Sequence, residues 1–292
     1  MRTGNLAAVT SVGEVVAYLE RRYPPGWAEA WDRVGLVLGE PDVPVGTVLL
    51  VVDCVPETVE QAVEVGAGLI LAHHPLLLRG VSSLAPTTYK GRIVHRLIRA
   101  GIALYTAHTN ADVAVPGVSD ALAYRLGLTD LRPLVPTEEG RGTGRIGPLA
   151  APEPLASFTG RVAASLPATA WGVRAAGDPD RPVRTVAVCG GSGDAFLAAA
   201  AGARVDAYVT ADLRHHPVSE YLADGGPALV DAAHWATEQP WLADVALGLT
   251  ADLGVRTVVS ELDTDPWTLH TPSRSRAGGP AAGRDEPKET RP

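Results

Sequence analysis

The chain has 292 residues and a formal net charge of −8, and its basic residues do not cluster into a stripe. This balance disfavours nucleic acid as an obligatory partner, because phosphate binding needs a positive surface. The sequence shows neither a signal peptide nor the run of about 20 apolar residues that predicts a membrane span. Cys54 and Cys189 lie within or just after apolar runs, which is typical of buried free thiols in a reducing compartment, so we expect a cytoplasmic protein.

The first predicted element is a helix that begins at a capping box, formed by Ser11 and Glu14 ahead of an apolar stripe. The chain then alternates short apolar runs with helical stretches. Up to residue 132, we predict strands at 47–53, 69–72 and 102–107, and helices at 56–66, 90–100 and 118–126. After residue 182, we predict strands at 183–189, 205–210, 228–233 and 255–260, and helices at 195–201, 218–223 and 239–253.

Strands that alternate with helices predict an α/β fold with largely parallel sheets covered on both faces. Residues 133–182, where Gly, Pro, Ala and Arg dominate, interrupt the alternation and are interpreted as a crossing segment with room for a short strand or helix of its own. We therefore expect a first α/β lobe at 1–132 and a second at 183–270. Residues 271–292 have no aliphatic side chain larger than Ala, which predicts a disordered tail.

Two adjacent histidines, His73 and His74, stand at the end of a predicted strand in the segment LILAHHPLL. Neighbouring side chains of a regular strand point to opposite faces, but Pro75 pushes His74 into an extended or turn conformation as the chain leaves the sheet. Both imidazoles are then able to reach one pocket, where each could serve one of two metal ions. The alternative is a pair of histidines that only bond backbone groups, and this motif alone does not decide between the two.

Two further strand ends carry residues that are able to bind a metal. Asp112 follows the predicted strand at 102–107, although an Asp in a loop is usually a turn or cap residue. His234 follows the strand at 228–233, and Glu238 stands four residues later. These two side chains share a face if a helix has begun by His234. Alternatively, Glu238 is a first-turn residue favoured by the helix dipole.

The functional prediction rests on the convergence of these residues at the carboxyl edge of a parallel sheet, where ligand sites of open α/β sheets lie. The candidate metal ligands are His73, His74, Asp112, His234 and Glu238. Imidazole and carboxylate suit Zn, Mn, Fe or Co rather than ions that prefer thiolate, and they do not select among these four. Five ligands are too many for one catalytic ion and too few for two closed structural sites, so they predict two divalent ions that share a carboxylate.

The motifs HHPLL, AHTNADVAVPGVSDALA, TADLRHHPVSEYL and DAAHWATE, with WDRVGL at residues 31–36, resemble those of the GTP cyclohydrolase 1 type 2 family, also called the NIF-three-like dinuclear-metal proteins. The resemblance covers most of residues 11–260. It implies two similar α/β lobes, a metal site between them and a toroidal homohexamer. It also implies that His74 and Asp112 bind one ion, that His73 and His234 bind the other, and that Glu238 bridges them. The short segment 133–182 indicates a compact form without the inserted domain of some members.

The resemblance also implies that three other histidines, His108, His215 and His216, line the pocket without binding the metals. A role in orienting ligands or transferring protons competes here with a structural or surface role. The family usually has Gly where Ala211 stands. The glycine-rich residues 190–194 match neither the Rossmann nor the Walker pattern, and they are interpreted as a tight turn between a strand and a helix.

We therefore expect a metal-dependent hydrolase that acts on a nucleotide or another small molecule. The resemblance implies opening of the GTP ring, but the sequence contains no identifiable motif that recognises guanine. One alternative is a two-metal phosphoesterase or amidase. The other is a ring-shaped scaffold that stores metal or binds a partner without catalysis.

Overall fold

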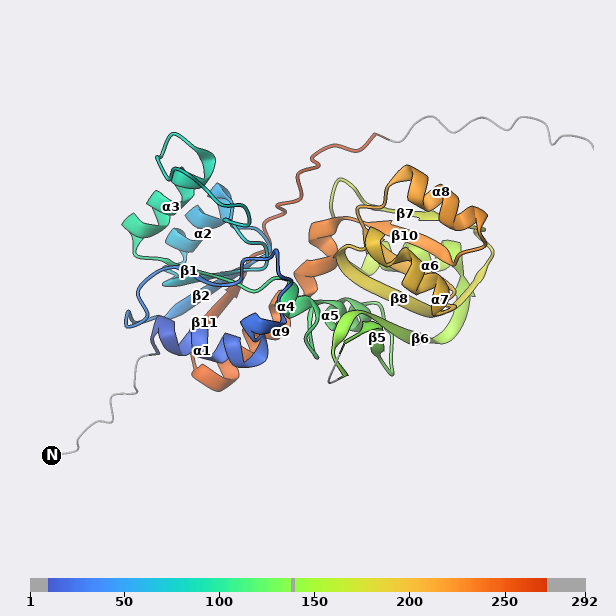
Figure 1. Cartoon of the computed structure of the whole chain (residues 1–292), viewed down its shortest axis with the longest axis horizontal. Helices are drawn as coiled ribbons and strands as arrows, with labels where there is room; N and C mark the ends of the chain where they lie inside the picture. Colours follow the sequence, from blue (N-terminus) through green and yellow to red (C-terminus); the bar gives the residue numbers. More distant parts are fainter. Residues whose placement is uncertain (1–9, 138–139, 272–292) are drawn as a thin grey trace, which may run out of the picture.

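The computed structural model describes residues 10–137 and 140–271. Its strands are β1 (Gly35–Leu38), β2 (Thr47–Val51), β3 (Leu69–Ala72), β4 (Ala103–Thr106), β5 (Arg132–Pro136), β6 (Gly142–Pro154), β7 (Val173–Ala176), β8 (Pro182–Ser192), β9 (Ala207–Ala211), β10 (Ala228–Ala232) and β11 (Arg256–Val259). They form two sheets in two lobes that lie side by side (Figure 1), so the predicted α/β class with two lobes is confirmed. Except for Thr271, the predicted tail at 271–292 lies outside the described residues.

The helices are α1 (Val12–Arg22), α2 (Pro56–Glu64), α3 (Tyr89–Ala100), α4 (Thr109–Asp112), α5 (Val118–Arg125), α6 (Leu155–Ser165), α7 (Leu197–Gly202), α8 (His215–Ala223) and α9 (His234–Leu253), with 3-10 turns at η1 (Pro25–Trp27) and η3 (Asp194–Phe196). The capping box that the sequence predicts is present, because Ser11 accepts from the Glu14 backbone and the Glu14 side chain accepts from the Ser11 backbone. None of the helices in the described part of the chain has the length and apolar character that a membrane crossing requires.

The first sheet has the strand order β1-β4-β3-β2-β11, and all its neighbours are parallel except β1 with β4. Its central strands are buried on both faces, because alternate side chains enter two different cores. Leu50, Leu71 and Tyr105 pack into one core, whereas their neighbours in the chain pack into the other. This arrangement explains why β2, β3 and β4 are continuous apolar runs in the sequence.

The second sheet has the order β5-β6-β8-β9-β10-β7 and is mixed. Here the expectation of a largely parallel sheet is wrong, because β5 with β6, β6 with β8, and β10 with β7 are antiparallel pairs. Residues 133–182 supply most of β5 and all of β6, α6 and β7, and thus form much of this lobe. Gly and Pro are frequent in β6 and weaken its strand pattern, so the sequence analysis did not identify it.

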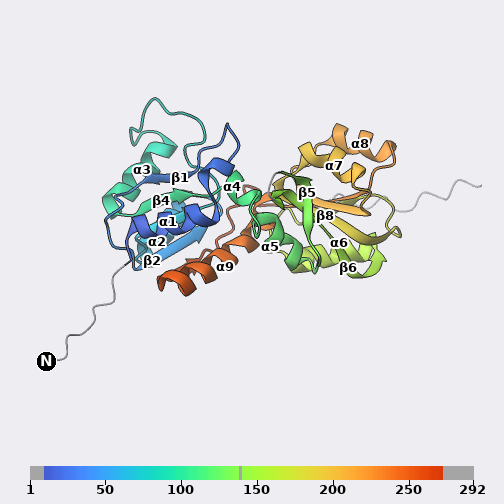
Figure 2. The ribbon, with the colours of Figure 1, turned by 60° about the horizontal axis from the view of Figure 1, so that its bottom comes forward.

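Helix α9 joins the two lobes. It packs against α5 and β8 and also against α1, β2 and β11 (Figure 2). Trp241 of α9 is buried at this junction, where its indole nitrogen donates to the hydroxyl of Tyr23 at 3.1 Å. The helix carries the chain back to the first lobe, where β11 pairs in parallel with β2. The sequence-based division places residues 255–260 with the second lobe, whereas the pairing places this strand in the first sheet.

A buried ion pair ties α5 to β6 beside the junction. Arg145 is 1% exposed, and its Nε donates to Asp120 at 2.7 Å. The other guanidinium nitrogens donate to the backbone carbonyls of Gly142, Gly144 and Ala114, so every guanidinium nitrogen has an acceptor. Removing one partner of such a buried ion pair strongly destabilises the fold, because the other charge is then left buried without compensation.

The Arg145→Met variant is therefore expected to lose about 3–5 kcal/mol of unfolding free energy, because Asp120 would remain buried without its partner. Urea denaturation at neutral pH measures this loss. The matched control is Arg96→Met, which breaks the ion pair between Arg96 and Glu60 on the surface. The control should unfold close to the wild type, because solvent screens exposed pairs. Equal destabilisation of the two variants would contradict the assigned role of Arg145.

Candidate metal centre

The candidate site lies at the junction of the lobes, where strands of both sheets end. His73 and His74 directly follow β3, and Asp112 is the last residue of α4, just beyond β4. His234 is the first residue of α9, directly after the turn that follows β10, and Glu238 lies one helical turn later. The five residues that the sequence analysis selected thus come together from both lobes, because the carboxyl ends of these strands face one another.

Glu238 is the centre of the cluster. One of its oxygens, Oε2, lies 3.0 Å from His74 Nε2, and the other, Oε1, lies 3.1 Å from His234 Nε2 and 3.5 Å from His73 Nε2. The side chain of Glu238 is almost completely buried. Helix α9 begins at His234, so His234 and Glu238 share a face as the four-residue spacing predicts.

Asp112 is nearest to His73. Its Oδ1 lies 3.7 Å from His73 Nε2, which is beyond hydrogen-bond distance. Within the described residues, His73 Nε2 is buried and has no hydrogen-bond partner. A buried nitrogen in this state, close to two carboxylates, fits a position where a cation would be bound.

Each imidazole is held in place through its other ring nitrogen. His73 Nδ1 lies 2.8 Å from the carbonyl oxygen of Ala107, and His74 Nδ1 lies 2.7 Å from Asp53 Oδ1. His234 Nδ1 lies 2.7 Å from Asp212 Oδ2. When Nδ1 donates in this way, Nε2 is the nitrogen that remains for a metal. The geometry therefore fits the donor set that the sequence predicts.

The sequence analysis missed Asp53 and Asp212. Asp212 directly follows the buried strand β9, and Asp53 stands two residues after the last residue of β2. An acidic residue at the end of an apolar run was visible in the sequence, where Asp53 is the last residue of the predicted strand at 47–53. The hydrogen bond from His234 lowers the pKa of Asp212. Its carboxylate therefore stays ionised as an acceptor for the imidazole.

Replacing either acceptor, in Asp53→Asn or Asp212→Asn, is expected to weaken metal binding by about 10–100-fold without unfolding the protein. The amide is close in shape to the carboxylate but holds the imidazole less strongly and reduces its basicity. Competition with a fluorescent chelator measures this change. The control is Asp263→Asn, an exposed residue outside the cluster, which should bind metal as the wild type does. Wild-type affinity in both test variants would contradict the orienting role.

The charges of the cluster depend on one another. Burial would raise the pKa of Glu238, but His234, His74 and His73 outweigh it and hold the pKa well below its usual range. Burial would conversely lower the pKa of His74 and His234, but the carboxylates raise them to about 10 and about 11. For His73 too, the carboxylates outweigh burial and raise the pKa. The site therefore favours positive charge beside Glu238, whether protons or metal ions supply it.

His108 also belongs to the site. Its ring centroid lies 5.2 Å from that of His73 and 5.5 Å from that of His74, and its Nδ1 lies 2.9 Å from Asp32 Oδ1. Burial would raise the pKa of Asp32, but hydrogen bonds from His108 and Thr109 lower it below its usual range. This contact gives a structural reason for Asp32 in the motif WDRVGL. Within the described residues, two groups could hold a metal: His73 with His74 and His108, and His74 with His234 and Glu238.

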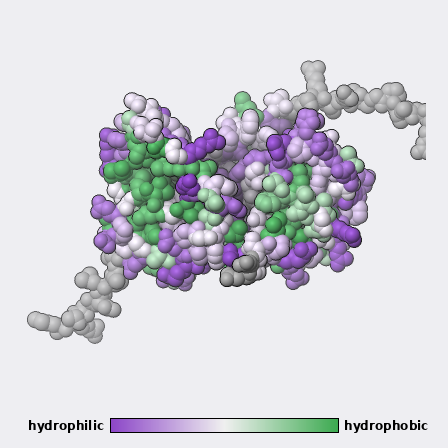
Figure 3. Space-filling model, viewed as in Figure 1, coloured by the Kyte–Doolittle hydropathy of each residue, from purple (hydrophilic) through white to green (hydrophobic). Residues whose placement is uncertain are grey.

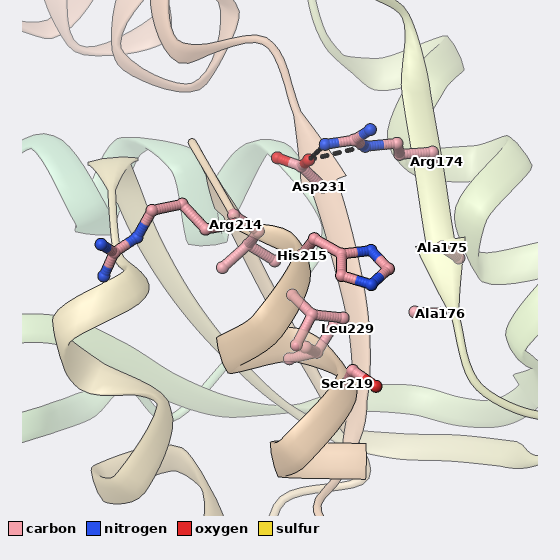
Figure 4. Close-up of a pocket in the computed structure, with 10 residues that line it drawn as sticks. Arg174, Ala175, Ala176, Arg214, His215, Ser219, Leu229 and Asp231 are labelled. Atoms are coloured by element: carbon pink, nitrogen blue, oxygen red, sulfur yellow. Dashed lines mark hydrogen bonds and ion pairs between the residues drawn. The ribbon is translucent and has the colours of Figure 1, made fainter.

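The second His-His-Pro motif lies elsewhere. His215 and His216 begin α8 and are exposed. His215 points toward Ala175 and Ala176 of β7 in a recess of about 280 Å³, with Arg174 and Asp231 nearby (Figure 4). This recess adjoins the cavity that His74 and His234 line, because Arg174 and Leu213 line both hollows. A role for either histidine at the metal centre stays a prediction.

Gly191 lies directly against the cluster, which the interpretation of residues 190–194 as a turn did not foresee. Its backbone has φ 65°, and a Cβ added there would lie 2.2 Å from Glu238 Oε1 and 2.9 Å from His234 Nε2. A side chain at this position would displace both groups. The glycine therefore keeps space for the cluster as well as allowing the turn.

The cluster opens into a cavity of about 390 Å³. His74 and His234 line it together with Asp53 and Asp212. Its remaining wall comes from the second lobe and from residues after β11. A small molecule in this cavity would lie beside the candidate ligands of both lobes.

Comparison with known proteins identifies relatives over most of the chain. The model of the family Duf34/NIF3 (NGG1p interacting factor 3) matches residues 10–266. A "GTP cyclohydrolase 1 type 2 homolog" of Streptomyces coelicolor is 52% identical over 281 residues, which cover 92% of this chain and 99% of that protein. The homologue of Mycobacterium tuberculosis is 38% identical over 377 aligned positions, which cover 91% and 99%, so it contains residues that this chain lacks.

Two solved structures share the fold. The Bacillus cereus protein related to NIF3 has a TM-score of 0.83 and 25% identity, and the match covers 90% of this chain and all (100%) of that one. The Staphylococcus aureus protein SA1388 has a TM-score of 0.82 and 26% identity, with the same coverage of 90% and 100%. Both likenesses extend over the two lobes and hence over the site at their junction.

Proposed function

The chain belongs to the Duf34/NIF3 family, and from this membership and the geometry of the site we propose that it binds two divalent metal ions and acts as a metal-dependent hydrolase on a nucleotide or another small molecule. His74 and Asp112 would bind one ion, and His73 and His234 the other. Glu238 would bridge the two ions. Zn, Mn, Fe and Co all suit this donor set.

One observation carries the proposal: three imidazole Nε2 atoms lie around the two oxygens of one buried carboxylate. His73 and His234 are both nearest to Oε1 of Glu238, and His74 is nearest to Oε2. This division supports separate ions for the two groups. Asp112 is nearest to His73, so its pairing with His74 rests on the family resemblance alone.

Divalent ions at such a site polarise a substrate oxygen and make water more acidic at neutral pH. The chain itself supplies orientation and charge. The bonds of Asp53 and Asp212 to Nδ1 fix the imidazole planes, and buried Glu238 keeps negative charge between them. The relatives are named as homologues of GTP cyclohydrolase 1 type 2, which makes GTP the first substrate to test.

The test compares turnover of GTP by the metal-loaded wild type and by the His74→Ala variant. We expect the variant to lose turnover in proportion to its loss of bound metal. Equal residual rates in the two proteins would contradict a catalytic role. Turnover of other phosphoesters or of amides, but not of GTP, would support a hydrolase with a different substrate. Tightly bound metal without turnover of any of these compounds would instead favour a ring-shaped scaffold that stores metal or binds a partner without catalysis.

We also propose that the chain assembles as a homohexamer in the cytoplasm. Several large apolar side chains are exposed, among them Ile98, Tyr124 and Leu247. On the face shown in Figure 3, apolar residues gather over each lobe, with more polar residues between them. Such surfaces commonly mark contacts between proteins. Light scattering should give a mass of about six times the 30.4 kDa of one chain, and the mass of a monomer would contradict the proposal.

A further inference from the structure

The segment after β11, residues 260–271, forms part of the wall of the metal cavity. It leaves the first lobe and runs above α9 toward the second lobe (Figure 1). Thr264 Oγ1 donates to Asp53 Oδ2, and the backbone N–H of Trp267 donates to Asp265 Oδ1 at 2.9 Å. Asp53 in turn orients His74, so the segment is attached to a candidate metal ligand.

Two tryptophans from distant parts of the chain meet in this wall. The rings of Trp171 and Trp267 have centroids 5.6 Å apart and planes inclined by 38°. The guanidinium carbon of Arg174 lies 4.6 Å from the ring centroid of Trp171. Arg174 is fixed in turn by Asp231, its cross-strand partner between β7 and β10, whose Oδ2 lies 2.7 Å from Arg174 Nε (Figure 4). The strand pairing and this ion pair thus fix Arg174 beside Trp171.

Trp267 is 58% exposed, and it lines the same cavity as Trp171, Arg174 and the ligands His74 and His234. Aromatic faces beside a charged centre suit a molecule that has a flat ring and a polar part. Bases stack on tryptophan because every base has a π face, and this contact does not depend on reading one particular base.

We propose that Trp171 and Trp267 form a stacking wall that binds the flat heteroaromatic ring of the substrate, as in a nucleoside, and places its polar part beside the metal centre. This inference deepens the proposed function and rests on it for the nature of the substrate. Trp267 then selects substrates that have a flat ring over those that lack one, and residues 260–271 belong to the substrate site.

The test measures binding of guanosine, adenosine and cytidine, with ribose 5-phosphate as the probe without a ring, to the metal-loaded full chain by calorimetry. Trp267→Ala should raise the Kd of the nucleosides about tenfold and leave that of ribose 5-phosphate unchanged. Trp267→Phe should keep most of the affinity, because a flat ring remains. The matched control is Leu269→Ala, in the same segment, where the side chain is 89% exposed and does not line the cavity.

The stacking wall is wrong if the wild type binds none of the three nucleosides, or if Trp267→Ala and Leu269→Ala bind them equally well. It is also wrong if Trp267→Ala changes only the oligomeric state, since the residue would then be an interface residue. Metal content and turnover of the same samples separate this inference from the proposed function. Nucleoside binding that depends on Trp267 in a protein without turnover supports the wall and contradicts the hydrolase.

Discussion

The Glu238→Ala variant is expected to lose its bound metal, with a decrease in affinity of at least about 100-fold, since even the loss of a group that only orients a ligand weakens binding about 10–100-fold. Both oxygens of Glu238 lie within 3.5 Å of an imidazole nitrogen, and no other carboxylate of the described cluster reaches all three histidines. Without it, His74 and His234 would lose the carboxylate nearest to their Nε2 atoms, and only Asp112 would remain beside His73.

Elemental analysis after dialysis against metal-free buffer measures this loss, and circular dichroism shows whether the variant remains folded. Glu238→Gln should also lose metal, because a neutral amide does not replace a bridging carboxylate. The matched control is Asp244→Ala, which removes an exposed carboxylate from the same helix. Metal content equal to that of the wild type in Glu238→Ala would contradict the assignment, as would an equal loss in Asp244→Ala.

Metal binding is expected to release at least two protons per chain at pH 7 and to strengthen steeply with pH. The pKa of His74 is raised to about 10 and that of His234 to about 11, so both imidazoles are protonated at pH 7 in the metal-free protein. A metal needs the neutral imidazole, so each must lose its proton on binding. Affinity therefore rises with pH while the metal-free histidines remain protonated, and it levels off above these pKa values.

Two released protons correspond to a rise of up to about 100-fold in the apparent binding constant per pH unit. Calorimetry in buffers with different ionisation enthalpies counts the protons directly. The Asp212→Asn variant should have a lower pKa at His234, because it removes one of the two carboxylates that raise it, so its affinity should level off at a lower pH than that of the wild type. An affinity that does not change between pH 6 and pH 8 would contradict the coupling between protons and metal at this cluster.

Much of the fold could be predicted from sequence because its central strands are buried on both faces. The short continuous apolar runs of β2, β3 and β4 are typical of strands in a parallel sheet that is covered on both faces. The signal failed at β6 and β7, where Gly, Pro and exposed residues interrupt the alternation. The position of β11 could not be predicted, because strand order depends on where a long helix such as α9 carries the chain.

His73, His74 and His234 were identifiable because each stands at or just after the end of an apolar run, and Asp112 and Glu238 because they follow such ends within a few residues. The groups that orient them were not identified, although Asp53 and Asp212 carry the same kind of signal as Asp112. Gly191 was interpreted only as a turn residue, because sequence does not show what a missing Cβ would touch. The stacking wall joins Trp171 and Trp267, and only the tertiary structure brings these two together.

The most direct test of the central claim is a crystal structure of the metal-soaked protein, with anomalous scattering and elemental analysis to identify and count the ions. We expect two ions per chain, one bound by His73 and His234 and the other by His74 and Asp112, with Glu238 bridging them. A single ion, or none within bonding distance of Glu238, would contradict the dinuclear centre.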